Sequence, residues 1–494
     1  MRPAAKGKMK RPPNIVVIMA DQWRADHLGV TPGSRCPTPS LDRLAARGCL
    51  FTRAVTPNPV CQPARAAFLT GRYPHQVNLT CQNGDLRSDV RTFLQALQDA
   101  GYHTVSCGKL HYWHTSRPTK DGLAGFLEEQ KKYGFDEIAY YDYRELKGST
   151  WCQGKDLLEA AGLLEQGLAH GRSVGVAGYD RQAPIATRWP GAVWPLPEEL
   201  YLDNVVGAKA EQILRRMPTD APFYLQVTFG GPHAPYDPPA SHLAATPYLE
   251  EDDFIEPDGH PLSPADKKAL GANRQRYRAM IACLDAWIGR MLDVLEVRGL
   301  TADTLVAFTS DHGEMLGDHG LYNKQMPYKE STRIPMIVAW PGRPTARRHD
   351  GMVELTDLTA TLLDAAGIEQ AGALNSSILS FHGRLPGRSL RGVVTGASEA
   401  PVRDFAFSVG DGVWIMVESS RWKLVRWTRD AVAAAPREEL FDLVADPAEL
   451  VNRAGDPACR TILMEHRERM LRVLESTPPA QMMALGADPP GPSP

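Results

Sequence analysis

Short apolar runs alternate with amphipathic segments along most of the chain. Few polar residues interrupt the runs at 14–20, 104–107, 223–229, 304–309 and 334–340. Such runs are typical of strands that are covered on both faces of a parallel sheet. The amphipathic spacing predicts helices at 38–48, 89–100, 198–217, 265–298 and 357–366. Alternating strands and helices of this kind predict an α/β fold.

The pattern changes after about residue 390. Short strand-like segments at 405–418, 422–427 and 440–443 are separated by turn residues, and a helical segment follows at 458–474. This predicts a smaller α+β subdomain built on an antiparallel sheet. We therefore expect a main catalytic domain at 11–395, a C-terminal subdomain at 396–475, and a disordered Pro- and Gly-rich tail at 476–494.

Residues 118–197 lack clear periodicity, and Gly, Pro, Trp and Tyr accumulate there. A long irregular insertion of this kind usually acts as a lid or rim of a functional site. Four tryptophans in or beside it either line a pocket for a sugar or aromatic ring, or form a small core of the loop itself. The sequence leaves both interpretations open for Trp113, Trp151, Trp189 and Trp194.

Composition excludes several classes of protein. The 494 residues are 43% hydrophobic and carry a net charge of −3, which gives no reason to expect nucleic acid or an anionic membrane as a partner. No apolar run approaches the roughly 18 residues that span a bilayer, and the first run is too short for a signal peptide. The 8 cysteines are scattered, without disulfide-scaffold or zinc-site spacing. We expect a cytoplasmic protein with reduced thiols.

The segment Cys61-Gln62-Pro63-Ala64-Arg65 stands before an apolar run. Because Pro is tolerated in the first turn of a helix, the segment predicts a loop that places one sulfur at a helix N-terminus. An anion there would meet free backbone N–H groups and the positive end of the helix dipole. Taken alone, Cys61 is better explained as a small buried apolar residue.

Polar side chains follow four of the predicted strands. They are Asp21-Gln22, Lys109 with His111, His233, and Asp311-His312. Each of them alone fits a turn or capping role. Because carboxyl ends of parallel strands meet at one edge of a sheet, together they predict a site for a hard divalent cation. Ca²⁺ is the expected ion, with Mn²⁺ or Mg²⁺ as alternatives because of the imidazole.

Several ordered segments between about residues 14 and 460 carry a family resemblance. They are Ala20-Asp21-Gln22 with Asp26 and Gly29, Cys61-Gln62-Pro63-Ala64-Arg65 with Leu69-Thr70-Gly71, Gly108-Lys109-Leu110-His111, Pro232-His233, Ser310-Asp311-His312-Gly313-Glu314 through Gly317-Asp318-His319-Gly320 to Lys324, and Glu439-Leu440-Phe441-Asp442-Leu443 with Asp446-Pro447. With these segments the chain resembles a type I, formylglycine-dependent sulfatase of the alkaline-phosphatase superfamily. The resemblance implies a large mixed, mostly parallel sheet sandwiched by helices, as in alkaline phosphatase.

The resemblance implies that a formylglycine-generating enzyme converts Cys61 to formylglycine. One hydroxyl of the hydrated aldehyde would attack the sulfur of a sulfate monoester and expel the alcohol. The other would then eliminate inorganic sulfate and regenerate the aldehyde. Carried over by position, Asp21, Gln22, Asp311 and His312 would bind the metal ion, and formylglycine at position 61 would complete its shell.

The same resemblance implies roles for five further side chains. Arg65 would stabilise the hydrate, and Lys109 and Lys324 would hold the sulfate oxygens. His111 would deprotonate the second hydroxyl, and His233 would protonate the leaving oxygen as a general acid. The expected partners are a small sulfate ester and the maturation enzyme, and a homo-oligomer is compatible with the sequence.

Two positions depart from the commonest pattern of the family. Gln22 stands where many sulfatases have Asp, and His312 stands where many have Asn. This combination resembles choline-sulfatase-like enzymes and the phosphonate monoester hydrolases, which use the same formylglycine. The pair Lys109 and His111 favours sulfuryl transfer, because the phosphonate hydrolases have hydroxyl-bearing residues in that region. The alternative is therefore a phosphonate monoester or phosphodiester hydrolase, and a non-catalytic protein that binds a sulfated ligand is disfavoured.

Overall fold

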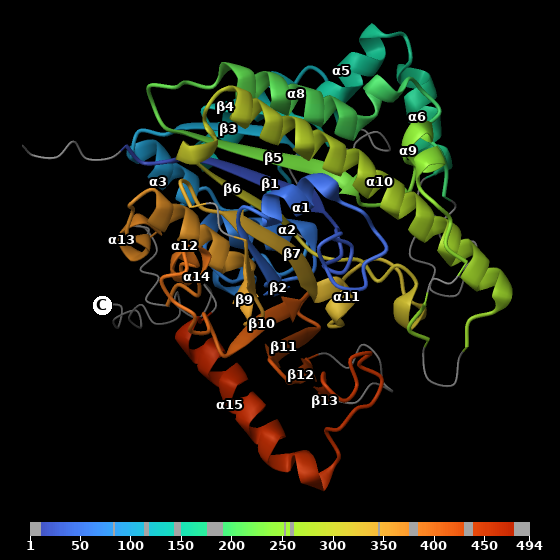
Figure 1. Cartoon of the computed structure of the whole chain (residues 1–494), viewed down its shortest axis with the longest axis vertical. Coiled ribbons are helices and arrows are strands. Elements are labelled where there is room, and N and C mark those ends of the chain that lie inside the picture. Colours follow the sequence, from blue (N-terminus) through green and yellow to red (C-terminus); the bar gives the residue numbers. More distant parts are fainter. Residues whose placement is uncertain are drawn as a thin grey trace, which may run out of the picture.

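The computed structural model describes residues 11–82, 84–112, 118–142, 150–174, 191–250, 253–256, 261–343, 346–374, 384–428 and 438–478. Within these residues a nine-stranded sheet lies between two layers of helices (Figure 1). A separate four-stranded sheet packs beside the long C-terminal helix. The expected α/β fold with a smaller antiparallel sheet is confirmed.

The main sheet is mixed and mostly parallel, with the strand order β4-β3-β5-β1-β6-β7-β2-β8 and β9 beside β2. Among the described strands of this sheet, only β7 runs antiparallel to its neighbours, β6 and β2. The strands are β1 (Asn14–Asp21), β2 (Cys49–Val55), β3 (His103–Gly108), β4 (Glu137–Tyr140), β5 (Phe223–Pro232), β6 (Thr304–Ser310), β7 (Arg333–Ala339), β8 (Arg347–His349) and β9 (Val353–Glu354). The carboxyl ends of β3, β5, β1 and β6 therefore lie side by side at one edge.

Successive residues of β1 face two separate hydrophobic layers, as the twofold period of a strand requires. Val17 belongs to one buried cluster and Val16 to the other. The first layer is built from α2 (Cys61–Thr70), α3 (Phe93–Asp99), α4 (Leu123–Gln130) and α12 (Leu355–Ala365). The second is built from α1 (Pro39–Ala45), α8 (Leu202–Arg216) and α10 (Pro264–Val297). Both faces of the sheet are covered, which explains the uninterrupted apolar runs.

The C-terminal sheet is a meander. Its strands are β10 (Phe405–Gly410), β11 (Trp414–Ser419), β12 (Trp422–Trp427) and β13 (Glu438–Asp442), and α15 (Arg460–Ser476) packs against β11 and β12. The predicted strand at 405–418 is thus a hairpin of two strands. Of the expected tail, Ser476 ends α15 and Thr477 is buried against His75, whereas 479–494 lie outside the described residues.

The expected irregular insertion is wrong over 118–142 and 150–174, because this part contains α4, β4, α5 (Gln153–Ala160) and α6 (Leu164–Ser173). Here β4 forms the edge strand beside β3. Trp194 packs in a small cluster of its own with Leu158 and Tyr201, and Trp151 packs against the main core. The other two tryptophans of interest, at 113 and 189, lie outside the described residues.

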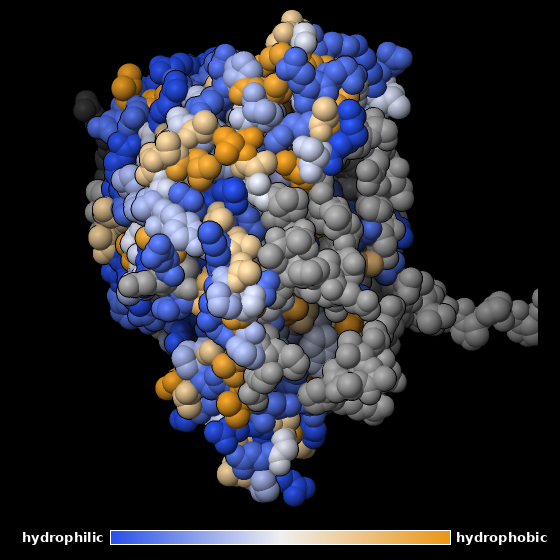
Figure 2. Space-filling view, turned by 90° about the vertical axis from the view of Figure 1, so that its right-hand side faces the viewer, coloured by the Kyte–Doolittle hydropathy of each residue, from blue (hydrophilic) through white to orange (hydrophobic). Residues whose placement is uncertain are grey.

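The remaining helices are short and peripheral: α9 (Ala240–Ala245), α11 (Lys329–Thr332), α13 (Gln370–Leu374) and α14 (Arg391–Val394). Figure 2 shows a face on which hydrophobic residues are interspersed among hydrophilic ones. None of the helices in the described part of the chain combines the length and the apolar character that crossing a bilayer requires.

Candidate active site

Four neighbouring strands deliver the predicted polar residues to one edge of the sheet. Asp21 is the last residue of β1, and Asp311 directly follows β6. Lys109 follows β3, and His233 follows β5. These strands are parallel and adjacent, so the four side chains approach the same place from different parts of the sequence.

Cys61 is the first residue of α2 and is fully buried. Val60 before it is extended, with φ −140°, and Pro63 fits the first helical turn. The sulfur of Cys61 lies 3.4 Å from Oδ1 of Asp21, 3.1 Å from Nε2 of His312 and 3.0 Å from Nζ of Lys324. The predicted sulfur at a helix N-terminus therefore lies within reach of the strand-end groups.

Asp21, Cys61, Asp311 and His312 each offer a ligand atom, and these atoms lie within 4.8 Å of one another. His312 donates from Nδ1 to the carbonyl of Gly313 at 2.8 Å, which leaves Nε2 as the nitrogen that faces the cluster. Two carboxylates and an imidazole held in this way fit a divalent cation.

The two oxygens of each carboxylate face different partners. Oδ2 of Asp21 accepts from Lys109 at 2.6 Å, and Oδ2 of Asp311 accepts from Nε of Arg65 at 2.9 Å. Nη2 of Arg65 bridges both, at 2.8 Å from Asp311 and 3.4 Å from Asp21. Both Oδ1 atoms lie 3.6 Å from Nε2 of His312. The Oδ1 atoms thus lie on the side of the His312 ring and the Cys61 sulfur, and the Oδ2 atoms are paired with cationic side chains of the protein.

These contacts shift the two carboxyl groups in opposite directions. Burial and the Cys61 sulfur oppose ionisation of Asp21, but Lys109, His233 and Arg65 outweigh them and hold its pKa well below the usual value. Burial, and then the charge of Asp21, raises the pKa of Asp311. Burial would lower the pKa of Arg65, yet Asp311 and Asp21 raise it. Asp21 therefore remains a carboxylate, as a metal ligand must.

Gln22 and Lys324 complete the enclosure around the sulfur. Oε1 of Gln22 accepts from Nζ of Lys324 at 2.8 Å. Gln22 adopts a left-handed backbone conformation, with φ 70°, and its N–H donates to Oδ1 of Asp311 at 3.1 Å. A non-glycine residue in that region is held there by its surroundings and often marks a functional site.

The two predicted acid–base histidines lie on the loops after β3 and β5. His111 is half-buried and left-handed, with φ 59°, two residues after Lys109. The N–H of Lys109 donates to the carbonyl of Thr228 at 3.0 Å and fixes the start of this loop. His233 is buried and donates from Nδ1 to the carbonyl of Ala234 at 2.6 Å. Its charge acts on Asp21, whereas the catalytic roles of both histidines stay predictions.

Sequence reasoning assigned no role to two buried acids next to this site. Glu314 accepts from the Gln22 amide nitrogen and from the N–H of Leu316 at 3.0 Å. Its place in the segment that follows β6 was a usable signal. Asp203, at the start of α8, accepts from the N–H groups of Gly230 and Gly231. Nothing in the sequence around Asp203 indicates this long-range contact.

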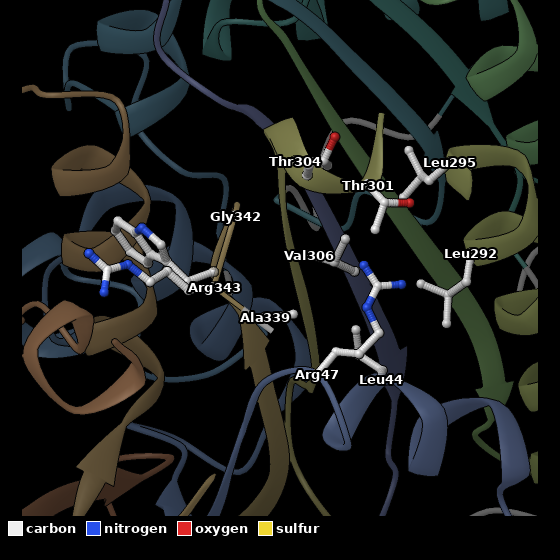
Figure 3. Close-up of a pocket in the computed structure, with 12 residues that line it drawn as sticks. Leu44, Arg47, Leu292, Leu295, Thr301, Thr304, Val306, Ala339, Gly342 and Arg343 are labelled. Carbon is white, nitrogen blue, oxygen red and sulfur yellow. The ribbon is translucent and has the colours of Figure 1, made fainter. Parts of the chain in front are cut away.

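A separate pocket opens at the other edge of the main sheet (Figure 3). Thr304 at the start of β6 lines it together with Leu44 and Arg47, while Asp311 follows the far end of the same strand. Its volume of about 190 Å³ is below the roughly 300–1,000 Å³ that is usual for small-molecule sites. We assign it no ligand.

Comparisons with a family model and with known proteins both find sulfatases. The family model described as Sulfatase matches residues 13–368. An arylsulfatase from Clostridium perfringens is 28% identical over 487 residues, covering 94% of this chain and 94% of the relative. A choline-sulfatase from Rhizobium meliloti is 28% identical over 477 residues, covering 90% of this chain and 83% of the relative.

Solved structures confirm the expected fold. The phosphonate monoester hydrolase of Agrobacterium radiobacter matches with a TM-score of 0.73 at 24% sequence identity, over 94% of this chain and 96% of the other. The likeness extends to nearly the whole length of both chains, so the main sheet and the C-terminal sheet belong to one alkaline-phosphatase-like architecture.

Proposed function

The chain belongs to the sulfatase family, and from that premise we propose that it hydrolyses a sulfate monoester to an alcohol and inorganic sulfate. The nucleophile of the proposed reaction is formylglycine made from Cys61, and one divalent cation assists it. The position of Cys61 carries the proposal: its sulfur lies 3.0 Å from Lys324 and 3.1 Å from His312 at the N-terminus of α2. A purely structural cysteine needs neither a lysine side chain nor a potential metal ligand at that distance.

The proposed ligands of the cation are Asp21, Gln22, Asp311 and His312, together with the group at position 61. When bound, the ion would lower the pKa of a hydroxyl of the formylglycine hydrate and so supply a nucleophile at neutral pH. The largely oxygen-based ligand set supports Ca²⁺, with Mn²⁺ or Mg²⁺ as alternatives.

The chain's own residues would do the rest. Lys109 and Lys324 carry ammonium groups beside Asp21 and Cys61, where they would hold the sulfate oxygens and the charge that develops on them. Arg65 keeps Asp311 in place and would stabilise the hydrate. His233 would donate a proton from Nε2 to the departing alcohol, because its Nδ1 is engaged with Ala234. His111 would take the proton from the second hydroxyl.

A formylglycine-generating enzyme is the proposed partner in maturation, and the scattered cysteines support a cytoplasmic location. The fold shared with the phosphonate monoester hydrolase keeps one second candidate, the hydrolysis of a phosphonate monoester or phosphodiester by the same nucleophile. The pair Lys109 and His111 supports the sulfuryl assignment.

Two measurements test the proposal. After co-expression with a formylglycine-generating enzyme, the peptide that contains Cys61 should be about 18 Da lighter than encoded. The matured protein should then release sulfate from an aryl sulfate, a small alkyl sulfate or a sulfated sugar faster than it cleaves a phosphonate monoester, and Cys61→Ala should do neither. Faster phosphonate cleavage, or full activity with an unmodified thiol, would overturn the proposal.

A further inference from the structure

Asp203 holds the segment that delivers His233 to the site. Its side chain is fully buried at the start of α8. Oδ1 accepts from the N–H of Gly230 at 2.8 Å and from the N–H of Gly231 at 3.2 Å. Because Gly231 lies only two residues before His233, these bonds fix the position of the backbone that carries the imidazole.

The second oxygen of Asp203 is pressed against the same segment. A Cβ added to Gly231 would lie 2.6 Å from Oδ2, so the close approach depends on the missing side chain of Gly231. Oδ2 is buried and makes no hydrogen bond within the described part of the chain. Fixing a backbone segment with a carboxyl group that is withdrawn from water is costly, because burial must be offset by the bonds made.

We propose that Asp203 is a positioning residue for protonation of the leaving group. It acts through Gly230 and Gly231 on His233, and it does not itself touch the substrate. The inference rests on the proposed function only in so far as His233 is the general acid. Nδ1 of His233 is fixed on Ala234, so a small displacement of the backbone moves Nε2 with it.

Such a role has a signature that a general structural role lacks. A proton is needed when the leaving oxygen is a poor leaving group, as in an alkyl sulfate. The oxygen of 4-nitrophenyl sulfate departs readily without one. Displacing a general acid therefore slows the first reaction far more than the second, whereas partial unfolding or loss of metal slows both alike.

The test compares kcat/KM for an alkyl sulfate and for 4-nitrophenyl sulfate in the matured, metal-loaded enzyme. Asp203→Leu should lower the alkyl rate by about 10-fold or more and the nitrophenyl rate by less than about 3-fold. Asp203→Asn keeps an acceptor oxygen and should recover most of the alkyl rate. In a His233→Ala background, Asp203→Leu should add no further selective loss.

Asp285 on α10 offers a matched control. It is also buried, and it also accepts two consecutive backbone N–H groups, from Ser40 and Leu41 at 2.9 Å each. Asp285→Leu should change stability without changing the ratio of the two rates. An equal loss on both substrates in Asp203→Leu, or a selective loss in Asp285→Leu, would overturn the inference.

Gly231→Ala approaches the same contact from the other side and decides the question if Asp203→Leu fails to fold. It should show the same selective loss on the alkyl ester. Gly289→Ala is its control, because the added Cβ would lie 2.6 Å from Oγ of Ser40, another polar side-chain atom. If Gly231→Ala changes kcat/KM by the same factor for both esters, relative to wild type, the result would count against the role.

The proposed function can fail separately. If the wild type cleaves phosphonate monoesters in place of sulfates, the sulfatase proposal falls, and the same ratio is then measured with alkyl and nitrophenyl phosphonates. A selective loss there still supports Asp203 as the positioning residue. If the loss is not selective for the alkyl ester with either sulfates or phosphonates, the inference about Asp203 is overturned.

Discussion

Glu314 shows how a single residue outside the ligand set can fix a ligand. Its side chain is fully buried. One oxygen accepts from the N–H groups of Leu316 at 3.0 Å and Asn323 at 2.5 Å, and the other accepts from the amide nitrogen of Gln22. The amide oxygen of Gln22 must then point away from Glu314, toward Lys324. A carboxylate only accepts hydrogen bonds, so it satisfies donors at both of its oxygens at once.

Glu314→Gln should therefore weaken metal binding. The new amide has one acceptor oxygen, whereas donors face both oxygens of the carboxylate, so an N–H group must face either a backbone N–H or the Gln22 amide. Losing an outer partner of a ligand typically costs about 10- to 100-fold in metal affinity. Isothermal titration of the metal-free protein with Ca²⁺ and with Mn²⁺ measures this directly, without an activity assay.

Glu354→Gln is the control for that measurement. Glu354 is also fully buried and accepts from the hydroxyl of Tyr73 and the N–H of Phe407, where β9 meets α12. Its replacement should reduce stability and leave metal affinity within about 3-fold of wild type. Equal affinity in Glu314→Gln and wild type would contradict the assigned role of Glu314.

The site could be predicted from the sequence to the extent that its residues follow strands. Asp21, Lys109, His233 and Asp311 each stand directly or almost directly after an apolar run, and parallel strands bring such positions together. Asp203 could not be found in this way. It belongs to a helix, and its partners at Gly230 and Gly231 are identified only by the packing of α8 on β5.

At the scale of elements, strands with a continuous apolar run were predictable, whereas β2 and β4 of the main sheet were missed. The predicted strand at 304–309 is β6, and the predicted helix at 265–298 is α10. The strand β2 was missed because Thr52 and Arg53 interrupt its apolar pattern. Edge strand β4 has only four residues, and its neighbours on the chain are helices, so its sequence carries too little periodicity.

One contact between elements makes stability depend on pH. His75 is half-buried and contacts the rings of Tyr73 and Phe407. Its Nε2 donates to the carbonyl of Thr477 at 2.7 Å, just beyond α15. Its Nδ1 has no hydrogen-bond partner within the described residues. Burial lowers the pKa of His75 to about 4. The folded state therefore disfavours the protonated imidazole.

The direction of this pH dependence follows from whether the folded or the unfolded state binds the proton. Above about pH 6.5 His75 is neutral in both states, and its contact contributes fully. Between about pH 6.5 and 4 the unfolded chain takes up a proton that the folded chain does not. The free energy of unfolding therefore decreases as the pH is lowered. From pH 7 to pH 5 this single group should cost about 2 kcal/mol in the free energy of unfolding.

Urea unfolding of wild type and His75→Gln at pH 7, 6 and 5 measures the effect. Gln keeps a donor for Thr477 but does not titrate, so its stability should fall about 2 kcal/mol less than that of wild type over this range. Subtracting the two curves removes the contribution of all other groups. Parallel curves would show that His75 titrates alike in both states.

At the scale of the whole molecule, the parts on either side of the predicted boundary near residue 395 share buried clusters. Val55 and Met352 of the main part lie in one buried cluster with Trp414 and Phe441. Tyr73 lies in another with strands of the C-terminal sheet. An ion pair crosses the boundary as well, because the buried Glu418 accepts from Arg333 at 2.6 Å.

The C-terminal hairpin also supports the loops that form the site. The N–H of Val409 donates to the carbonyl of Pro57 at 3.0 Å, four residues before Cys61. The indole of Trp414 donates to the carbonyl of Gln325 at 2.8 Å, next to Lys324. The side chain of Gln325 in turn donates to Asp411 at 2.7 Å. The two segments that present Cys61 and Lys324 therefore rest on the smaller sheet.

We accordingly predict that residues 11–395 alone do not form a stable, metal-binding unit. Exposing Val55, Tyr73 and Met352 should cost about 1.5–3 kcal/mol each. Their sum is comparable to the whole stability of a typical domain, about 5–15 kcal/mol. Urea unfolding and titration with Ca²⁺ should show no cooperative transition and no binding, whereas a chain ending at residue 478 should retain both. Cooperative unfolding with metal binding in 11–395 would instead show that the main sheet builds the site without the smaller one.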